Sequence, residues 1–194
     1  MEVKSIAVIG AHAVGREFAR AAALAGYGVV FEDVSREMLE RGVSWVGASL
    51  EEAVARGELT ARARAAALAR IVCANTVEAG IRDADLIIEA VPEELEMKLE
   101  LFTIFDKFAK PGAIFVSTTR TMSVLDLSDV TVYRERCVGM RFRDGGISGG
   151  AIGGSVIELV RTKLTSNETV RVCREVAGRL AGEVLEMEDS GAAT

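Results

Sequence analysis

The sequence predicts an α/β fold with a doubly wound, mostly parallel sheet, and three observations support this. Short apolar runs of strand length alternate along the chain with longer segments of helical periodicity. The first run ends in a glycine turn, Gly10 to Gly15, which leads into a helix. The strand after that helix ends in the acidic pair Glu32 and Asp33. Strand, glycine turn, helix, strand and acid, in this order, form the dinucleotide-binding fingerprint of a Rossmann sheet.

The glycine turn supplies the first candidate site. Gly10 lets the chain turn sharply off the strand over residues 6–9, and Gly15 lets the following helix approach the sheet. Val14 begins the apolar face of that helix, whose free N–H groups would face a pyrophosphate. His12 stands at the middle position, where the fingerprint has glycine. We therefore take these four residues as candidate cofactor contacts.

His12 leaves two interpretations open. Its imidazole lies beside the phosphates of a bound nucleotide, or it belongs to a nucleotide fold that no longer binds, because a β-carbon crowds the approach to the pyrophosphate. Asp33 favours binding, since an acid after the second strand accepts hydrogen bonds from ribose hydroxyls and repels a 2′-phosphate. The sequence thus predicts weak binding of NAD in preference to NADP.

The middle of the chain continues the alternation of strands and helices. A helical hairpin is expected over residues 35–69, with strands over residues 71–73 and 85–91. Pro92 is expected at the first position of the next helix, with Glu93 and Glu94 in its first turn.

The last part of the chain contains four expected strands, over residues 113–117, 137–142, 156–160 and 183–187. Thr165 and Glu168 have the spacing of a capping box for the last helix. The glycine-rich segment 145–154 lacks the lysine and hydroxyl residue of a phosphate loop, so it is expected to be a connector.

Composition is typical of one cytoplasmic domain, expected over residues 1–189 with a short tail at 190–194. The net charge is −6 and no basic cluster is present, which argues against nucleic acid as a partner. No apolar run reaches membrane-spanning length. The three widely spaced cysteines predict reduced core thiols, and a single histidine argues against a metal site.

Several motifs occur together in a fixed order: GAHAVG, VVFED, ADLIIEAVPEELEMKLELF, FVSTTRTMSVLDL, CVGMRF and VIELV. This series resembles the NAD-binding domain of the L-3-hydroxyacyl-CoA dehydrogenases over nearly the whole chain. The resemblance implies NAD as the cofactor and places Asp33 at the acid that contacts the adenosine ribose. It places Glu93 and Lys98 near the nicotinamide half of the cofactor. It places Ser49 and Arg56 where the family contacts the coenzyme A of its substrate.

Five further positions follow from the same resemblance. Glu158 falls at the glutamate that orients the catalytic histidine, and Ser117 begins the family's Ser-Asn-Thr-Ser segment. Arg120 replaces the last serine of that segment, which hydrogen-bonds the substrate. Arg141 replaces the histidine that serves as the general base, and Asp144 replaces an asparagine that contacts the cofactor. The spacing between Ser117 and Arg141 equals the family's spacing.

These replacements predict reduced activity. Arginine does not deprotonate in proteins and cannot accept the proton of an alcohol. General-base catalysis contributes about 10²–10⁴-fold, so the loss of base and serine should remove most of the standard activity. The resemblance also places a helical domain after residue 189, and its absence predicts a homo-oligomer or a partner subunit.

Three functional hypotheses remain open. The chain is an ordinary 3-hydroxyacyl-CoA dehydrogenase, an NAD(H)-binding relative without standard turnover, or an NAD-dependent oxidoreductase for another anionic hydroxy or keto substrate. Arg141 and Glu158 are expected to form an ion pair, which leaves Arg120 to help bind a carboxylate or phosphate. The alternative is that both arginine side chains extend into solvent.

Overall fold

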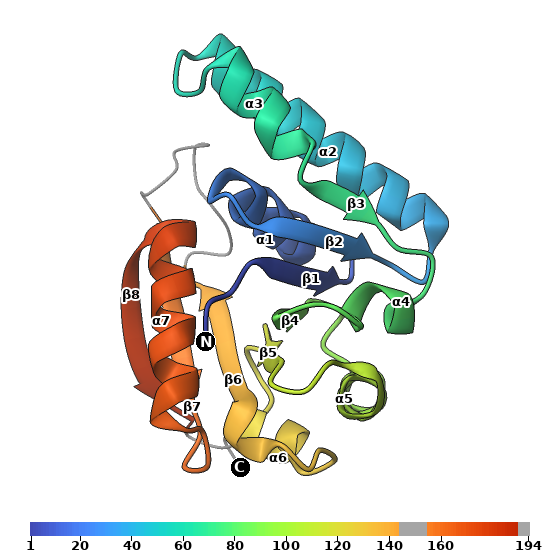
Figure 1. Cartoon of the computed structure of the whole chain (residues 1–194), viewed down its shortest axis with the longest axis vertical. Coiled ribbons are helices and arrows are strands. Elements are labelled where there is room, and N and C mark those ends of the chain that lie inside the picture. Colours follow the sequence, from blue (N-terminus) through green and yellow to red (C-terminus); the bar gives the residue numbers. More distant parts are fainter. Residues whose placement is uncertain (144–154, 190–194) are drawn as a thin grey trace.

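A computed structural model describes residues 1–143 and 155–189 of the chain. Eight strands form one sheet in the order β3-β2-β1-β4-β5-β6-β7-β8, with helices on both faces (Figure 1). The strands are β1 Ser5–Ile9, β2 Gly28–Glu32, β3 Ile71–Cys73, β4 Leu86–Glu89, β5 Ile114–Ser117, β6 Cys137–Phe142, β7 Ser155–Arg161 and β8 Gly182–Glu188. All pairings are parallel except the pairing of β6 with β7. The predicted doubly wound, mostly parallel sheet is therefore confirmed.

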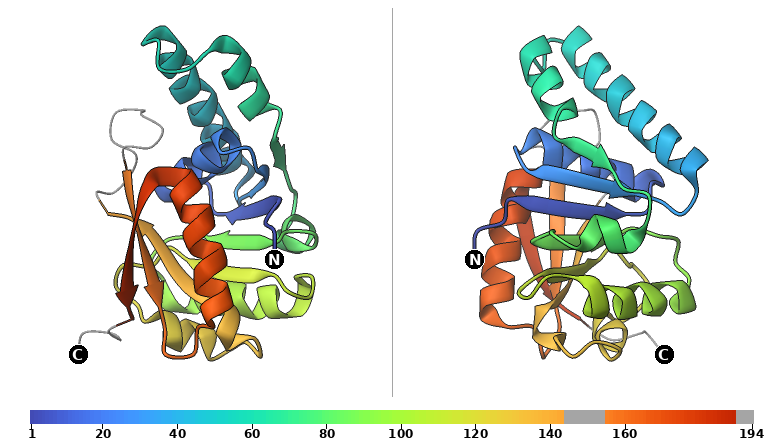
Figure 2. Two further views of the ribbon diagram at one scale, coloured as in Figure 1. Left: turned by 60° about the vertical axis from the view of Figure 1, so that its left-hand side comes forward. Right: turned by 45° about the vertical axis from the view of Figure 1, so that its right-hand side comes forward.

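The helices divide between the two faces of the sheet. One core contains residues of α1, α2, α3 and α7, and the other contains residues of α4, α5 and α6. The longer helices are α1 Ala13–Leu24, α2 Arg36–Ala55, α3 Ala61–Leu68, α5 Leu95–Phe108 and α7 Asn167–Ala181. The shorter ones, α4 Val77–Ile81, α6 Val124–Ser128 and the 3₁₀ turn η1 Arg134–Arg136, were not expected from the sequence. Figure 2 shows the α2–α3 hairpin at one end of the molecule, where both helices pack on α1.

Parallel pairing brings the carboxyl ends of the central strands to one edge. The last residue of β1, Ile9, pairs with Glu32 of β2 on one side and with Glu89 of β4 on the other. Glu89 in turn pairs with Ser117 of β5. Because the strand order reverses between β1 and β4, this edge is where sheets of this type bind ligands.

The start of α5 differs from the expectation. The helix begins at Leu95 after the N-cap Glu94, so Pro92 is not its first residue and Glu93 lies outside it. The chain turns instead, with Glu94 N donating to Pro92 O over 2.7 Å. The Glu93 carboxylate then accepts hydrogen bonds from the loop after β5. Glu93 therefore makes tertiary contacts and does not belong to the first turn of α5.

The expected capping box of α7 is also wrong. Ser166 is the N-cap and accepts a hydrogen bond from Thr169 N at 3.1 Å. Thr165 is buried and donates to Cys137 O at 2.8 Å, which joins the loop to β6. One cysteine also departs from expectation, because Cys73 is exposed on the edge strand β3 whereas Cys137 and Cys173 are buried. None of the helices in the described part of the chain is long and apolar enough to span a membrane.

Candidate functional site

The glycine turn between β1 and α1 has no space for side chains at its two glycines. Gly10 has a φ of 104°, and a β-carbon there would lie 2.6 Å from Ala90 O. A β-carbon on Gly15 would lie 1.8 Å from Gly10 O. The N-cap of α1 is His12, whose side chain makes no capping hydrogen bond, and no acidic residue lies in the first turn. The N-terminus of α1 therefore offers backbone N–H groups to an anion, as the fingerprint requires.

The imidazole of His12 is exposed and stands between two cavities. One cavity of about 360 Å³ lies on the β2 side of the turn, and another of about 350 Å³ lies on the β5 side. His12 therefore lies at the boundary between the two cavities.

Asp33, directly after β2, is hydrogen-bonded to the backbone of the glycine turn. Its Oδ2 accepts a hydrogen bond from Ala11 N at 2.8 Å, and its Oδ1 accepts one from Ser35 N at 2.8 Å. A carboxylate oxygen has two lone pairs, so both oxygens keep the capacity to accept from ribose hydroxyls. The sequence predicted the contact of Asp33 with the ribose, but the hydrogen bond from Ala11 N to Asp33 is known only from the structure.

The cavity on the β2 side has mostly apolar walls. Its polar lining consists of His12, Glu32, Asp33, Ser35 and Glu100. The remaining walls come from the end of β1, from the loops after β1, β2 and β4, and from α2, α4 and α5: Ile9, Gly10, Val34, Met38, Val77, Val91, Pro92, Met97, Leu101 and Ile104. A volume near 360 Å³ with few polar groups is typical of a small-molecule site.

Glu32 is the unexpected member of this lining. Its side chain is 1% exposed, and Oε2 is buried without a hydrogen-bond partner among the described residues. Burial, followed by the negative charges of Asp33 and Glu78, raises the pKa of Glu32 to about 7. The sequence does show a carboxyl group at the end of an otherwise apolar strand, but the dinucleotide-binding fingerprint indicates only the next residue, Asp33.

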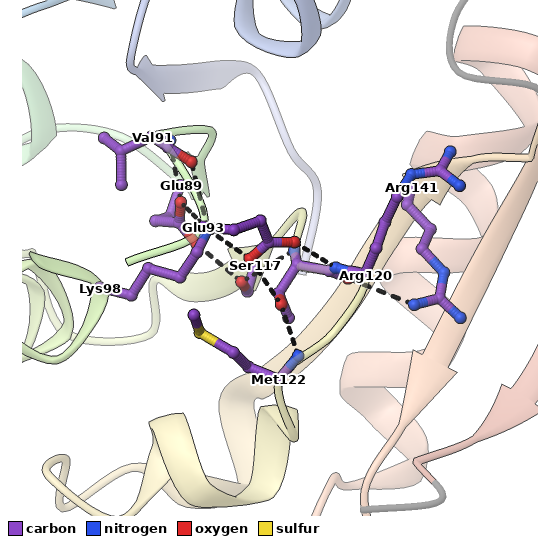
Figure 3. A network of polar contacts seen from close by, with 9 residues as sticks. Glu89, Val91, Glu93, Lys98, Ser117, Arg120, Met122 and Arg141 are labelled. Atoms are coloured by element: carbon purple, nitrogen blue, oxygen red, sulfur yellow. Dashed lines mark hydrogen bonds and ion pairs between the residues drawn. The ribbon is translucent and has the colours of Figure 1, made fainter. Parts of the chain in front are cut away.

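Glu89 is the centre of a buried polar network at the ends of β4 and β5 (Figure 3). Its Oε1 lies 2.7 Å from Lys98 Nζ and accepts from Val91 N at 2.9 Å. Its Oε2 accepts from Ser117 Oγ at 2.6 Å. Glu89 and Lys98 are 0% and 1% exposed. Burial raises the pKa of Glu89, and the three donors oppose that rise.

The same network reaches the cavity on the β5 side through Glu93. Its carboxylate accepts from Thr119 Oγ1 at 2.9 Å and from Arg120 N at 2.5 Å, and its Oε2 lies 3.6 Å from Lys98 Nζ. Glu93, Lys98 and Arg120 line this cavity together with His12 and Val14 and with Ala13, Ala90, Val91, Pro92 and Thr118. The structure thus brings together five of the residues singled out in the sequence. Glu89, which organises them, was missed, although an acid at the end of a buried apolar strand is a readable signal.

Arg141 and Glu158 form the expected ion pair. They face each other in the antiparallel pairing of β6 with β7, with 2.8 Å between Arg141 Nε and Glu158 Oε2. Arg141 NH1 also donates to Thr119 O at 3.3 Å. The guanidinium of Arg120 donates through NH2 to Phe142 O. Figure 3 shows both arginine side chains beside one end of the Glu89 network.

A third cavity, of about 430 Å³, adjoins these arginines. Its lining includes Arg120 and Arg141 but also Glu188 and Asp189 at the end of β8. Asp189 Oδ2 accepts hydrogen bonds from Ser123 Oγ and Leu125 N, both at 2.9 Å. The charge at this cavity is therefore mixed, because carboxylates share its wall with the two arginines.

The remaining candidates lie apart from this edge. Ser49 is on α2 and Arg56 caps its end, where Arg56 Nε donates to Glu58 Oε1 at 2.9 Å. Neither residue lines the three cavities described above. Asp144 and the glycine-rich segment 145–154 lie outside the described residues. No group of three potential metal-binding side chains occurs in residues 1–143 and 155–189.

Comparison with known proteins places this site in a family. The family model described as "3-hydroxyacyl-CoA dehydrogenase, NAD binding domain" matches residues 5–190. A 3-hydroxybutyryl-CoA dehydrogenase from Bradyrhizobium diazoefficiens is 33% identical over 187 residues, which cover 96% of this chain and 62% of that protein. A probable 3-hydroxybutyryl-CoA dehydrogenase from Bacillus subtilis is 29% identical, over 97% of this chain and 64% of its own length. The chain thus spans less than two thirds of these relatives.

Solved structures agree with these relatives. The (S)-3-hydroxybutyryl-CoA dehydrogenase PaaH1 from Ralstonia eutropha superposes with a TM-score of 0.90 at 26% identity, over 100% of this chain and 66% of that one. The 3-hydroxybutyryl-CoA dehydrogenase from Escherichia coli superposes with a TM-score of 0.89 at 27% identity, over 99% and 39% of the two chains. The chain therefore belongs to the 3-hydroxyacyl-CoA dehydrogenase family, within which it matches the NAD-binding domain.

Proposed function

We propose that the chain binds NAD(H) in the manner of its family but does not carry out the standard dehydrogenation of 3-hydroxyacyl-CoA. The observation that carries this proposal is the ion pair of Arg141 with Glu158. By the family resemblance, Arg141 stands where the general base belongs. An arginine held by a carboxylate has no acceptor atom for a proton.

The residues at the sheet edge fit NAD. Gly10 and Gly15 let the turn and α1 pack closely against the neighbouring backbone, which places the N–H groups at the N-terminus of α1 where a pyrophosphate would lie. Asp33 would accept hydrogen bonds from the adenosine ribose, and its charge favours NAD over NADP. The cavity on the β2 side would take the adenosine half, and the cavity on the β5 side, with Glu93 and Lys98, the nicotinamide half. When bound, NAD supplies the hydride acceptor of the family's reaction.

The hydroxyl groups near the nicotinamide side are already engaged in the fold. Ser117 Oγ donates to Glu89, and Thr119 Oγ1 donates to Glu93. Arg120 replaces the serine that by resemblance contacts the substrate, and its guanidinium donates to a strand carbonyl instead. These contacts stabilise the site, but they do not provide the proton acceptor that oxidation of an alcohol needs.

A second candidate function is an NAD-dependent oxidoreductase for 3-hydroxyacyl-CoA or another anionic hydroxy or keto substrate. The cavity near Arg120 and Arg141 favours it, since guanidinium groups bind carboxylates and phosphates well. Glu188 and Asp189 on the same wall weaken the attraction for anions. Ser49 and Arg56 would touch an acyl-CoA only if the substrate extends from this edge to the α2–α3 hairpin.

The test combines binding with turnover. NADH is titrated calorimetrically into the purified chain, and its oxidation with acetoacetyl-CoA is followed by absorbance. We expect binding without turnover. A turnover number above a few per second, within the ordinary enzyme range of about 1–10³ s⁻¹, would contradict the proposal.

A matched variant tests the stated cause. Arg120→Ser with Arg141→His restores the family's side chains at both positions and should raise turnover at least about tenfold above the unmodified chain. Arg82→His places an imidazole at an exposed position outside the three cavities and should leave turnover unchanged. If the double variant binds NADH but shows no increase, the arginines are not the reason for the low activity.

A further inference from the structure

Among the described residues, Glu32 Oε2 is buried without a hydrogen-bond partner. The strand β2 reads GVVFE, and Glu32 shares the face of Val30, which packs against α4 at Gly80. In the described part of the chain no cation forms an ion pair with it, and the charges that act on it belong to Asp33 and Glu78. Burying a polar oxygen without a hydrogen bond lowers the stability of the folded state. A group that costs stability inside a cavity is a candidate for ligand binding.

The position of Glu32 relative to Asp33 determines which part of a ligand it would meet. Asp33, His12 and Ser35 form the polar side of the cavity next to the glycine turn, where ribose and phosphates would lie. The apolar walls, among them Val77 and Leu101, enclose the space beyond, which suits a flat aromatic base. Glu32 is the buried polar side chain among those walls, since Glu100 is exposed.

We propose that Glu32 recognises the adenine base of the dinucleotide, with its buried carboxyl oxygen accepting a hydrogen bond from the exocyclic amine. Adenine presents this amine beside N7, a ring nitrogen that accepts a hydrogen bond. A carboxyl group that carries a proton offers an acceptor and a donor side by side and so matches both atoms. The raised pKa of Glu32, about 7, makes the protonated form available near neutral pH. The inference rests on the proposed placement of the adenosine half in this cavity.

The first measurement uses only the unmodified chain. Reduced nicotinamide hypoxanthine dinucleotide differs from NADH by a carbonyl oxygen in place of the amine. On the edge that carries N7 it therefore presents two acceptors, and the carboxyl group of Glu32 has a donor for only one of them. Binding of each is measured by calorimetry at pH 7. We expect NADH to bind at least about tenfold more tightly, because the analogue leaves a buried polar group without its partner. Equal affinities would overturn the inference.

Two variants assign the preference to this side chain. Glu32→Gln keeps an acceptor beside a donor and should retain the preference for NADH. Glu32→Val matches the β-branched residues of the strand and should reduce the preference to less than about threefold. Thermal unfolding of both variants shows that they are folded. A preference for NADH that persists in folded Glu32→Val would overturn the inference.

The matched control is Glu96→Gln, which removes a carboxylate from an exposed position of α5 outside the cavity. It should leave the preference unchanged. If Glu96→Gln abolishes the preference, the loss in Glu32→Val does not locate the adenine contact, and the assignment to Glu32 is wrong. If neither dinucleotide binds the unmodified chain, the nucleotide function itself fails, and this inference fails with it.

Discussion

Arg141 on β6 and Glu158 on β7 lie directly opposite each other in the antiparallel part of the sheet, with 2.8 Å between Nε and Oε2. Their side chains are 22% and 15% exposed, so water screens the pair only partly. This pairing gives the carboxylate of Glu158 a permanent cation. It also fixes the orientation of the guanidinium, which bonds Thr119 O.

We expect the pair to contribute measurably to stability. Arg141→Ala should lower the free energy of unfolding by about 1–3 kcal/mol, because it removes the nearer of the two cations that the described residues place at Glu158 and leaves only Arg143, at 3.9 Å. Glu158→Ala should have a similar effect, and the double variant should lose less than the sum. Urea unfolding of all four proteins measures the coupling. A coupling energy below about 0.3 kcal/mol would show that the pair is no stronger than an exposed one.

Asp33 is expected to serve both the glycine turn and the cofactor. In Asp33→Asn one of the two acceptor oxygens becomes an NH2 donor, so either Ala11 N or Ser35 N loses its acceptor. The free energy of unfolding should therefore fall by about 1–2 kcal/mol. Affinity for NADH should fall about tenfold or more, and the preference over NADPH should shrink as the negative charge is lost. Calorimetry with NADH and NADPH measures the affinities, and urea unfolding measures the free energy of unfolding. The exposed Asp126→Asn serves as the control and should change neither by more than about 0.5 kcal/mol. A loss of stability with unchanged affinity would restrict Asp33 to the turn.

Lys98 should matter for folding as well as for the site. Lys98→Met removes the cation 2.7 Å from the fully buried Glu89. Breaking a buried pair on one side costs about 3–5 kcal/mol. The double variant Lys98→Met with Glu89→Gln should recover part of the loss, because no bare charge remains. Urea unfolding measures the free energy of unfolding of both variants. An equal loss in the single and the double variant would mean that altered packing, not an unpaired charge, lowers the stability.

The order of strands and helices could be predicted because apolar runs of strand length alternate with amphipathic helices. The fingerprint at Gly10 and Asp33 also fixed the edge where the site lies. Short elements such as α4 and α6 escaped, since five residues carry little periodicity. The start of α5 and the cap of α7 were misplaced because Glu93 and Thr165 are used in tertiary contacts that local sequence does not reveal.

The site was predicted less completely than the fold. The resemblance indicated Glu93, Lys98 and the pair of Arg141 with Glu158, all of which lie near the sheet edge. It did not indicate Glu89 or Glu32, whose importance depends on burial rather than on a motif. Whether a side chain is buried depends on which helix covers each face of its strand. That arrangement is known only once the helices have been placed on the two faces of the sheet.

The last prediction concerns the pH dependence of stability and follows from Glu32. Its pKa is raised from the ordinary value of 4.5 to about 7, with burial as the main cause and Asp33 and Glu78 adding to it. The folded state therefore holds this proton more tightly than the unfolded state. The stability it contributes is fully present below pH 4.5 and is lost as the pH rises through about 7.

The free energy of unfolding should fall by roughly 3 kcal/mol as the pH rises through this range, at about 1.4 kcal/mol per pKa unit. Glu32→Gln is neutral at every pH, so its free energy of unfolding should fall less than that of the unmodified chain between pH 5 and pH 8. The other ionisable side chains near the cavity, His12, Asp33, Glu78 and Glu100, are the same in both proteins, so the difference between the two curves isolates Glu32. Urea unfolding at the two pH values, without nucleotide, measures it. Parallel curves for the two proteins would mean that Glu32 is ionised and hydrated in the folded state, which would contradict its burial.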